Sequence, residues 1–481
     1  MFDTRRLYHC GMSFLATLAI LSVAVEFAVG QTATQRRRPD AMIGAADLVA
    51  LATQCGGEQP AEESLELVRK HGCRNGRTST GEVLAFEENR WFVYALADMT
   101  RESSEASPAA PQAIRRLLLI KPSTLVIEDV ILAEASGRLG ILSRTEVKVD
   151  GKTFQVSAEG TAIDGERVLP EDATPSTASR PAQGDRPAIF YLGVSAEAEG
   201  ELARFVHVFQ VGGGDSEERP EIVEQQDGLQ LSVPAGDKVV QLTLPSKATA
   251  AGYIQIAAAD GAVAVPQRLL PSSVMPHGPE GAQLMERWDA PYRRDQMPGW
   301  DVGRPCTHLV KAVEEGTFKP GRAIVFGCGS GTNAIYLAKK GFDVIGVDVS
   351  PTALVIAAKK ASEAGVEVEW MLADVVTLPK LPAVDLIFDR GCYHHICQYD
   401  SPGYVASLCR LSKAGTQAMI LAGSPADGGR GGPPRIPEET IRNDFSKQFD
   451  FEWLRAINFD SRREGATGTS AWSIHLRRKS E

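Results

Sequence analysis

The stretch Val325-Phe326-Gly327-Cys328-Gly329-Ser330-Gly331 decides the fold of the C-terminal part of the chain. Apolar residues before the first glycine predict a short strand, residues 322–326, and residues 332–340 predict a helix after the last glycine. Because glycine has no side chain, the backbone of this turn can approach a ligand closely. Such a turn is typical of sites that bind NAD, FAD or S-adenosylmethionine, and the turn alone does not distinguish these ligands.

Strands and helices alternate after this turn. The further predicted strands are residues 343–347, 366–372, 384–388 and 417–422. The further predicted helices are residues 351–364, 403–412 and 436–448, the first with Ser350 as its N-cap and Pro351 at its first position. This alternation predicts a parallel, doubly wound α/β sheet.

Two carboxylates follow the second and third predicted strands. Asp348 lies 21 residues after Gly327, where an acidic side chain accepts hydrogen bonds from the two hydroxyls of a ribose. Asp374 is placed to accept the exocyclic amine of an adenine, and Val375 to pack on its ring. These three residues form a predicted cofactor site with the following ones: Gly327, Gly329, Gly331 and Ser350.

The motifs of the glycine turn and of both carboxylates resemble those of class I S-adenosylmethionine-dependent methyltransferases. They are residues 325–331, residues 346–351 (Gly-Val-Asp-Val-Ser-Pro) and the pair Ala373-Asp374. A final predicted strand pair, residues 451–459 and 471–478, separates this fold from the plain dinucleotide-binding fold.

Three further stretches resemble the thiopurine S-methyltransferase-like group, whose members methylate thiols, halides and metalloid oxyanions. They are residues 288–305 (which contain MPGWDVGRP at 297–305), residues 388–395 (FDRGCYHH), and residues 432–434 with 437–439. The resemblance covers residues 283–479 and implies S-adenosylmethionine as cofactor and a small-molecule methyl acceptor. It also implies an N-terminal lid, residues 283–305, in which Trp300 lies against the cofactor.

One position departs from the class I pattern. Most of these enzymes carry an acidic residue two places before the first glycine, where this chain has Val325. The thiopurine-like group often lacks that acid too, so we expect backbone carbonyls to hold the amino group of the cofactor.

The candidate residues for chemistry lie just after the fourth predicted strand, at the edge of the sheet that faces the ligand crevice. Asp389 is predicted to orient the acceptor or take its proton, and either His394 or His395 to act as a base. Tyr393 and Arg435 are predicted to contact the substrate. Since methyl transfer from a sulfonium needs mainly alignment and exclusion of water, a soft nucleophile needs little help from a base.

The N-terminal half has a different pattern. Residues 45–265 contain alternating apolar positions and Asp260-Gly261, a dipeptide typical of a tight hairpin, and predict an all-β, sandwich-like domain of unknown role. Residues 266–282, which are rich in proline and glycine, predict a linker to the methyltransferase domain, residues 283–481.

The first 30 residues predict a targeting segment. Two arginines precede an uncharged apolar stretch, and residues 28–30 (Ala-Val-Gly) suit signal peptidase, with residues 31–44 as a linker. The alternative is an uncleaved anchor that associates with a membrane through residues 11–30 and leaves the methyltransferase domain in the cytoplasm. A disulfide between Cys55 and Cys73 would suit export, and two unrelated thiols are the other interpretation.

The charge balance bears on the partners. The chain has 481 residues and a formal net charge of -10, which gives no general attraction to phosphate backbones, so nucleic acid is not an expected substrate. The cysteine spacing predicts no zinc site. Two other functions stay open: an NAD-type oxidoreductase, and an exported binding or surface protein with a degenerate methyltransferase fold.

Overall fold

The computed structural model describes most of the chain from Ala41 onward. The described residues are 41–57, 64–72, 74–75, 79–80, 82–100, 113–132, 136–173, 175–184, 187–197, 202–213, 218–225, 228–275, 278–378, 381–427, 432–463 and 466–480. The predicted targeting segment, its membrane association, most of the first linker and Cys73 lie outside them, whereas Cys55 is buried. No helix in the described ranges is long and apolar enough to span a membrane.

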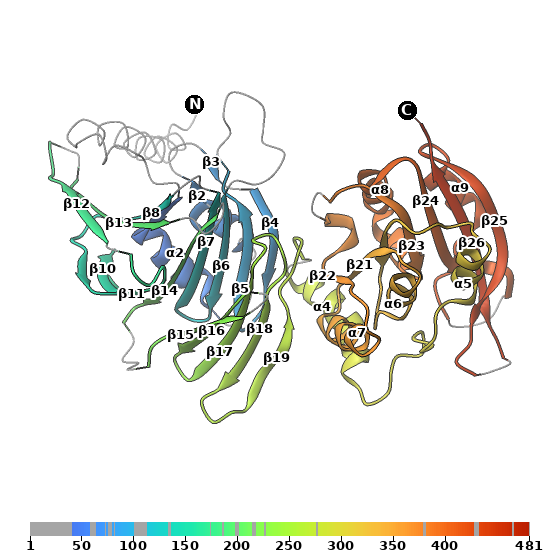
Figure 1. Ribbon diagram of the computed structural model, residues 1–481, viewed down its shortest axis with the longest axis horizontal. Helices are drawn as coiled ribbons and strands as arrows, with labels where there is room; N and C mark the ends of the chain where they lie inside the picture. The colour runs from blue at the N-terminus through green and yellow to red at the C-terminus, as the bar shows by residue number, and fades with distance from the viewer. Residues whose placement is uncertain are drawn as a thin grey trace, which may run out of the picture. The chain divides into compact units, whose positions relative to one another are not determined.

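The chain divides into two compact units near residue 250 (Figure 1). The first unit is β-rich, as predicted, and its largest sheet is antiparallel throughout. Its eight strands are, in order across the sheet, β4 (Glu82–Glu88), β5 (Phe92–Asp98), β6 (Ala113–Ile120), β7 (Thr124–Leu132), β14 (Leu202–Val211), β11 (Thr161–Leu169), β10 (Thr153–Ala158) and β9 (Lys148–Asp150).

The first unit contains further strands. A second sheet runs in the order β1 (Ala41–Gly44), β8 (Ser136–Ser143), β13 (Ile189–Glu197) and β12 (Ser176–Arg180). The remaining strands of this unit are β2 (Arg74–Asn75), β3 (Ser79–Thr80), β15 (Glu221–Gln225), β16 (Gly228–Ala235) and β17 (Lys238–Pro245). At the boundary between the units lie β18 (Tyr253–Ala258) and β19 (Val263–Leu269). The sandwich-like packing of this half stays a prediction.

The strand prediction was wrong for residues 45–55, which form helix α2 (Ala45–Cys55). Leu48, Val49, Ala52 and Cys55 are buried and recur at the spacing of one helix face, so a helix hides them together. Short helical turns follow at α3 (Ser64–Leu67) and η2 (Val68–Gly72).

The second unit contains the predicted doubly wound sheet, extended by the predicted terminal hairpin. Its seven strands are, in order across the sheet, β22 (Glu369–Leu372), β21 (Asp343–Asp348), β20 (Arg322–Phe326), β23 (Val384–Arg390), β24 (Ser412–Gly423), β26 (Thr467–Arg478) and β25 (Phe449–Asp460). The first five are parallel, and β26 and β25 are antiparallel to their neighbours. The sheet is therefore mixed, which confirms the class I methyltransferase arrangement.

Helices cover both faces of this sheet (Figure 1). They are α4 (Gly278–Asp289), α5 (Thr307–Glu314), α6 (Thr332–Lys339), α7 (Pro351–Glu363), α8 (Tyr393–Leu411) and α9 (Glu438–Phe445), with single turns at η3 (Ala290–Arg293), η4 (Val375–Thr377) and η5 (Pro425–Asp427). Successive side chains of β20 point to opposite faces of the sheet. Ile324 and Phe326 pack with α8 and α9 on one face, while Ala323 and Val325 pack with α5, α6 and α7 on the other.

The segment between β19 and α4 packs on the second unit, although the sequence predicted a linker there. Ser272 N donates to the carbonyl of Leu372 at 2.7 Å, and Ser273 Oγ accepts from Asp374 N at 3.0 Å. Pro271 also forms a parallel bridge with Leu372, so this segment continues the sheet beyond β22.

The start of α7 offers a test of the packing. Ser350 Oγ accepts from Ala353 N at 3.0 Å and donates to Asp289 Oδ1 at 2.7 Å. Replacing Ser350 by Ala should lower the free energy of unfolding by about 1–2 kcal/mol, because the cap and the buried partner of Asp289 are both lost. Urea denaturation of the full chain measures this change. Ser350→Thr, which keeps the hydroxyl, should lose less, and equal losses would contradict the capping role.

Candidate functional site

The glycine turn joins β20 to α6 through three residues in the left-handed region. Gly327, Gly329 and Gly331 have φ values of 54°, 55° and 80°, which side chains disfavour. A Cβ at Gly329 would lie 2.6 Å from the hydroxyl oxygen of Tyr292, and one at Gly331 would lie 2.6 Å from the ring of Trp370. The turn is therefore a backbone surface packed too closely for any larger residue.

Asp348 ends β21 directly behind this turn. Its Oδ2 accepts from Gly329 N at 2.7 Å and its Oδ1 from Ser350 N at 2.9 Å. Burial raises the pKa of this carboxyl to about 6, and the hydrogen bonds from the backbone oppose that rise only in part. A carboxylate has about four acceptor positions, so Asp348 retains capacity for the hydroxyls of a ribose.

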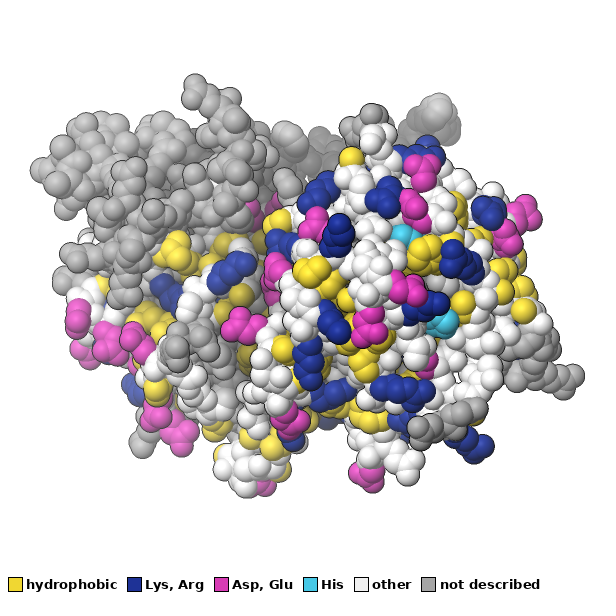
Figure 2. All heavy atoms as spheres, turned by 45° about the vertical axis from the view of Figure 1, so that its right-hand side comes forward, with side chains coloured by type: hydrophobic (Ala, Val, Ile, Leu, Met, Phe, Trp, Pro, Cys, Tyr) yellow, Lys and Arg dark blue, Asp and Glu magenta, His cyan; other side chains and the backbone are white. Residues whose placement is uncertain are grey.

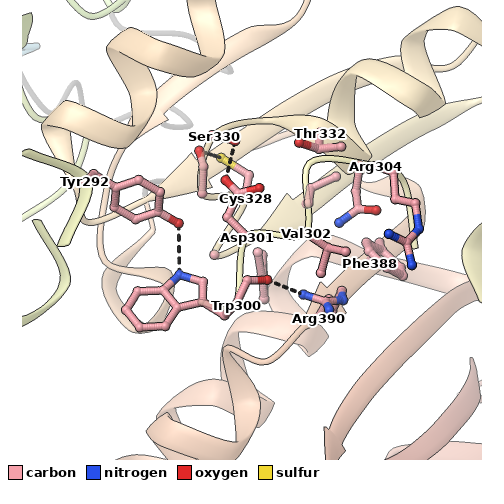
Figure 3. A pocket seen from close by; sticks show the side chains of 15 residues that line it. Tyr292, Trp300, Asp301, Val302, Arg304, Cys328, Ser330, Thr332, Phe388 and Arg390 are labelled. Atoms are coloured by element: carbon pink, nitrogen blue, oxygen red, sulfur yellow. Dashed lines mark hydrogen bonds between the residues drawn. The ribbon is translucent and has the colours of Figure 1, made fainter. Parts of the chain in front are cut away.

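The predicted lid contributes Trp300 to a pocket at the glycine turn (Figure 3). Trp300 Nε1 donates to the hydroxyl of Tyr292 at 3.1 Å, and Arg390 Nη1 donates to the carbonyl of Trp300 at 3.0 Å. The pocket is lined by Tyr292, Trp300, Asp301, Val302, Arg304, Val325, Phe326, Gly327, Cys328, Gly329, Ser330, Thr332, Asn333, Phe388 and Arg390. Trp300 is 46% exposed, so one side of the indole stays accessible.

Distant segments anchor the lid. Asp289 accepts from Thr352 N at 2.9 Å in addition to the hydroxyl of Ser350, which fixes the lid to the start of α7. Just after the lid, Thr307 donates from its backbone and its hydroxyl to Asp460, at 3.1 and 2.7 Å. Ser350 is fully buried by these contacts, so it positions Asp348 rather than presenting its hydroxyl to a ligand.

The other predicted cofactor residues lie at the same edge of the sheet. Asp374 Oδ1 accepts from Val376 N at 3.0 Å, and burial raises its pKa. Val375 is buried in η4. Burial raises the pKa of Cys392, and the charges of Asp389, Asp348 and Asp374 raise it further.

Residues 284–478 match the family model of thiopurine S-methyltransferase. An uncharacterised methyltransferase of Schizosaccharomyces pombe is 31% identical over 105 residues, which cover 22% of this chain and 72% of that protein. The C-terminal unit belongs to the thiopurine S-methyltransferase family. It is an S-adenosylmethionine-dependent methyltransferase, and the alternative of an NAD-type oxidoreductase is excluded.

Two other relatives of this methyltransferase have named activities. The 2-heptyl-1-hydroxyquinolin-4(1H)-one methyltransferase of Mycobacteroides abscessus is 29% identical over 167 residues, 34% of this chain and 72% of that protein. A probable thiol methyltransferase of Arabidopsis thaliana is 31% identical over 152 residues, 31% of this chain and 65% of its own length. The match therefore spans slightly less than two thirds of the plant protein.

The site residues fit the cofactor S-adenosylmethionine. Gly327 and Gly329 line the pocket, where a backbone without side chains can approach an extended ligand closely. Asp348 and Asp374 would hold the ribose and the adenine, and Trp300 would cover the sulfonium, for which an aromatic face is favourable.

Asp389 lies where the sequence predicted, at the end of the fourth strand of this sheet in chain order, and its carboxylate is engaged within the protein. It is fully buried at the end of β23, where Oδ1 accepts from Cys392 N at 2.7 Å and Oδ2 accepts from Tyr393 N and the hydroxyl of Tyr404, at 2.8 and 2.6 Å. Burial raises the pKa of this carboxyl to about 6. The carboxylate thus satisfies the first N–H groups of α8, which no residue of the helix itself can bind.

The two histidines differ in their surroundings. His394 is buried, and its Nδ1 accepts from Gly423 N at 3.1 Å, which leaves Nε2 to carry the proton of the neutral ring. Burial lowers the pKa of His394 to about 3 and that of His395 to about 4. His395 is half-buried, and its ring meets Trp288 edge-on at 4.5 Å between centroids.

The predicted substrate contacts do not converge. Tyr393 is buried, and its hydroxyl donates to Asp444 Oδ2 at 2.6 Å, so it supports the α8–α9 packing and is not presented to a substrate. Arg435 is half-buried near α9 and is absent from the lining of the pocket described above. Among the pocket residues that the sequence did not single out are Tyr292, Asp301 and Arg390, although all three fall in stretches that carried the resemblance.

Cofactor binding should depend on the ionisation of Asp348. Because burial raises its pKa to about 6, the carboxylate is present above that pH and is lost as the pH falls through it. The affinity for S-adenosylhomocysteine should therefore fall roughly tenfold per pH unit below about 6. Calorimetry between about pH 5 and pH 8 measures this. Asp348→Asn should bind weakly at every pH, and an unchanged pH dependence in that variant would assign the effect to another group.

Asp389→Asn separates a structural role from a catalytic one. An amide keeps one acceptor oxygen, so at least one buried hydrogen bond is lost, and the free energy of unfolding should fall by about 1–3 kcal/mol. Tyr404→Phe, which removes a single donor, should lose less. The pH dependence of turnover should match that of the unmodified enzyme. The opposite result would be an Asp389→Asn variant that is as stable as the unmodified enzyme, turns over much more slowly and shows no pH dependence in its residual turnover. That result would make Asp389 a base.

Proposed function

We propose that this enzyme methylates a small, soft nucleophile that arrives already ionised, namely a thiolate, a halide or a metalloid anion. One observation carries the proposal: two of the three candidate bases, Asp389 and His394, use acceptor atoms within the protein. Asp389 accepts three hydrogen bonds, and Nδ1 of His394 accepts from Gly423 N. A hard hydroxyl acceptor needs a base, whereas a soft anion does not.

The site is suited to alignment. S-adenosylmethionine supplies a methyl group on a positively charged sulfur, so the carbon–sulfur bond breaks with its electron pair going to sulfur as the nucleophile bonds to carbon. The chain then has to hold the two reactants in line and exclude water. The ring of Trp288 contacts those of Trp300 and His395 edge-on, with centroid distances of 5.8 and 4.5 Å. These polarisable rings favour a soft acceptor over a strongly hydrated one.

The named relatives support the same class and supply the main competitor. The plant relative is named for thiols, whereas the mycobacterial one is named for a hydroxyquinolinone. A heteroaromatic hydroxyl is therefore the acceptor against which thiols have to be compared.

We propose further that residues 1–30 export or anchor the protein. The support is the sequence pattern of two arginines followed by an uncharged apolar stretch. Determining the mature N-terminus in the native cell tests this, since an intact Met1 together with a soluble cytoplasmic protein would contradict it.

The pH dependence of turnover distinguishes the acceptor classes. With thiocyanate, which has no proton to lose, kcat/KM should be flat from about pH 7 to pH 9, because the cofactor-binding carboxylate is ionised there. With a thiol it should rise about tenfold per pH unit up to the pKa of the thiol itself. If kcat/KM changes with pH in this range for both acceptors, a base on the protein takes part. Faster turnover of 2-heptyl-1-hydroxyquinolin-4(1H)-one than of any thiol would overturn the proposal.

A further inference from the structure

Asp301 brings a negative charge into the cofactor pocket. It follows Trp300 in the lid, is half-buried, and supplies the one carboxylate among the described residues that line this pocket (Figure 3). Gly327 and Gly329 line the same pocket, so the carboxylate faces the glycine turn.

A chain of hydrogen bonds fixes this carboxylate. Lys360 Nζ donates to Ser330 Oγ at 2.8 Å, and the hydroxyl of Ser330 donates in turn to Asp301 Oδ2 at 2.5 Å. Asp301 Oδ1 accepts from Gly303 N at 3.1 Å. Two of about four acceptor positions are thus used, and the others can take a ligand donor.

Most class I enzymes bind the amino group of the cofactor with an acidic residue two places before the first glycine, and this chain has Val325 there. Val325 is only 2% exposed and packs in the core between β20 and the helices α5, α6 and α7. We propose that Asp301 of the lid replaces that acid and binds the α-ammonium of the methionine moiety of the cofactor. The expectation that backbone carbonyls hold the amino group is the competing prediction.

The rest of the pocket is complementary to the tail of an amino acid. Arg304 and Arg390 line it as well, and their guanidinium groups donate to the carbonyls of Ser461 and Trp300, at 2.9 and 3.0 Å. The pocket therefore offers one negative and two positive groups to a ligand that carries an ammonium and a carboxylate. Because Asp301 and Trp300 are adjacent, one segment of the lid would cover the sulfonium and bind the ammonium.

The test compares two ligands on the full-length protein by calorimetry. One is S-adenosylhomocysteine, and the other is its deaminated analogue, which has a hydrogen in place of the α-ammonium and keeps the carboxylate. Asp301→Asn should weaken binding of S-adenosylhomocysteine by about 10- to 100-fold, the usual effect of a charge-assisted hydrogen bond. The affinity for the deaminated analogue should stay the same, which also shows that the pocket is formed.

Asp460→Asn is the matched control, because Asp460 anchors the lid through Thr307 and is absent from the lining of the pocket. It should change the affinities for both ligands by the same factor. If Asp301→Asn also weakens both ligands equally, Asp301 is only an anchor of the lid and the proposal fails. It fails equally if Asp301→Asn leaves the affinity for S-adenosylhomocysteine unchanged.

Discussion

The hydrogen bond from Gly329 N to Asp348 holds the site together. It ties the glycine turn after β20 to the end of β21, and the second oxygen of the same carboxylate accepts from Ser350 N. Ser350 then caps α7 and binds Asp289, which ends the helix that leads into the lid. The cofactor surface and the lid are therefore positioned by one continuous polar chain, most of it buried, where an unmet partner is costly.

Local signals allowed much of the second unit to be predicted from sequence. The strand at residues 322–326 and the start of α7 at Pro351 have the predicted bounds, because an apolar run and a Ser-Pro pair act on their immediate neighbours. Helix α8 was predicted to begin near residue 403, whereas it begins at Tyr393. Its early part depends on Asp389 for its first N–H groups, and the helix is interrupted at Asp400, just before Pro402, so no regular apolar period marks it.

The chemistry of individual side chains was less accessible, because it depends on partners far along the chain. Nδ1 of His394 is occupied because it accepts from the backbone N–H of Gly423, and one oxygen of Asp389 is occupied by the hydroxyl of Tyr404. Asp301 reaches the pocket only because the lid folds back over a turn that lies later in the sequence. Figure 2 shows acidic and basic side chains interspersed over the face of the second unit. The composition of the chain therefore does not reveal which charged side chains meet in the pocket.

The terminal hairpin does more than complete the sheet. The end of β25 and the turn beyond it hold the lid through Asp460, Ser461 and Arg462, the last of which donates to the carbonyl of Asp301 at 2.8 Å. Residues about 150 positions apart are therefore joined beside the pocket. The two strands that a plain dinucleotide-binding fold lacks thus fix the segment that carries Asp301 and Arg304.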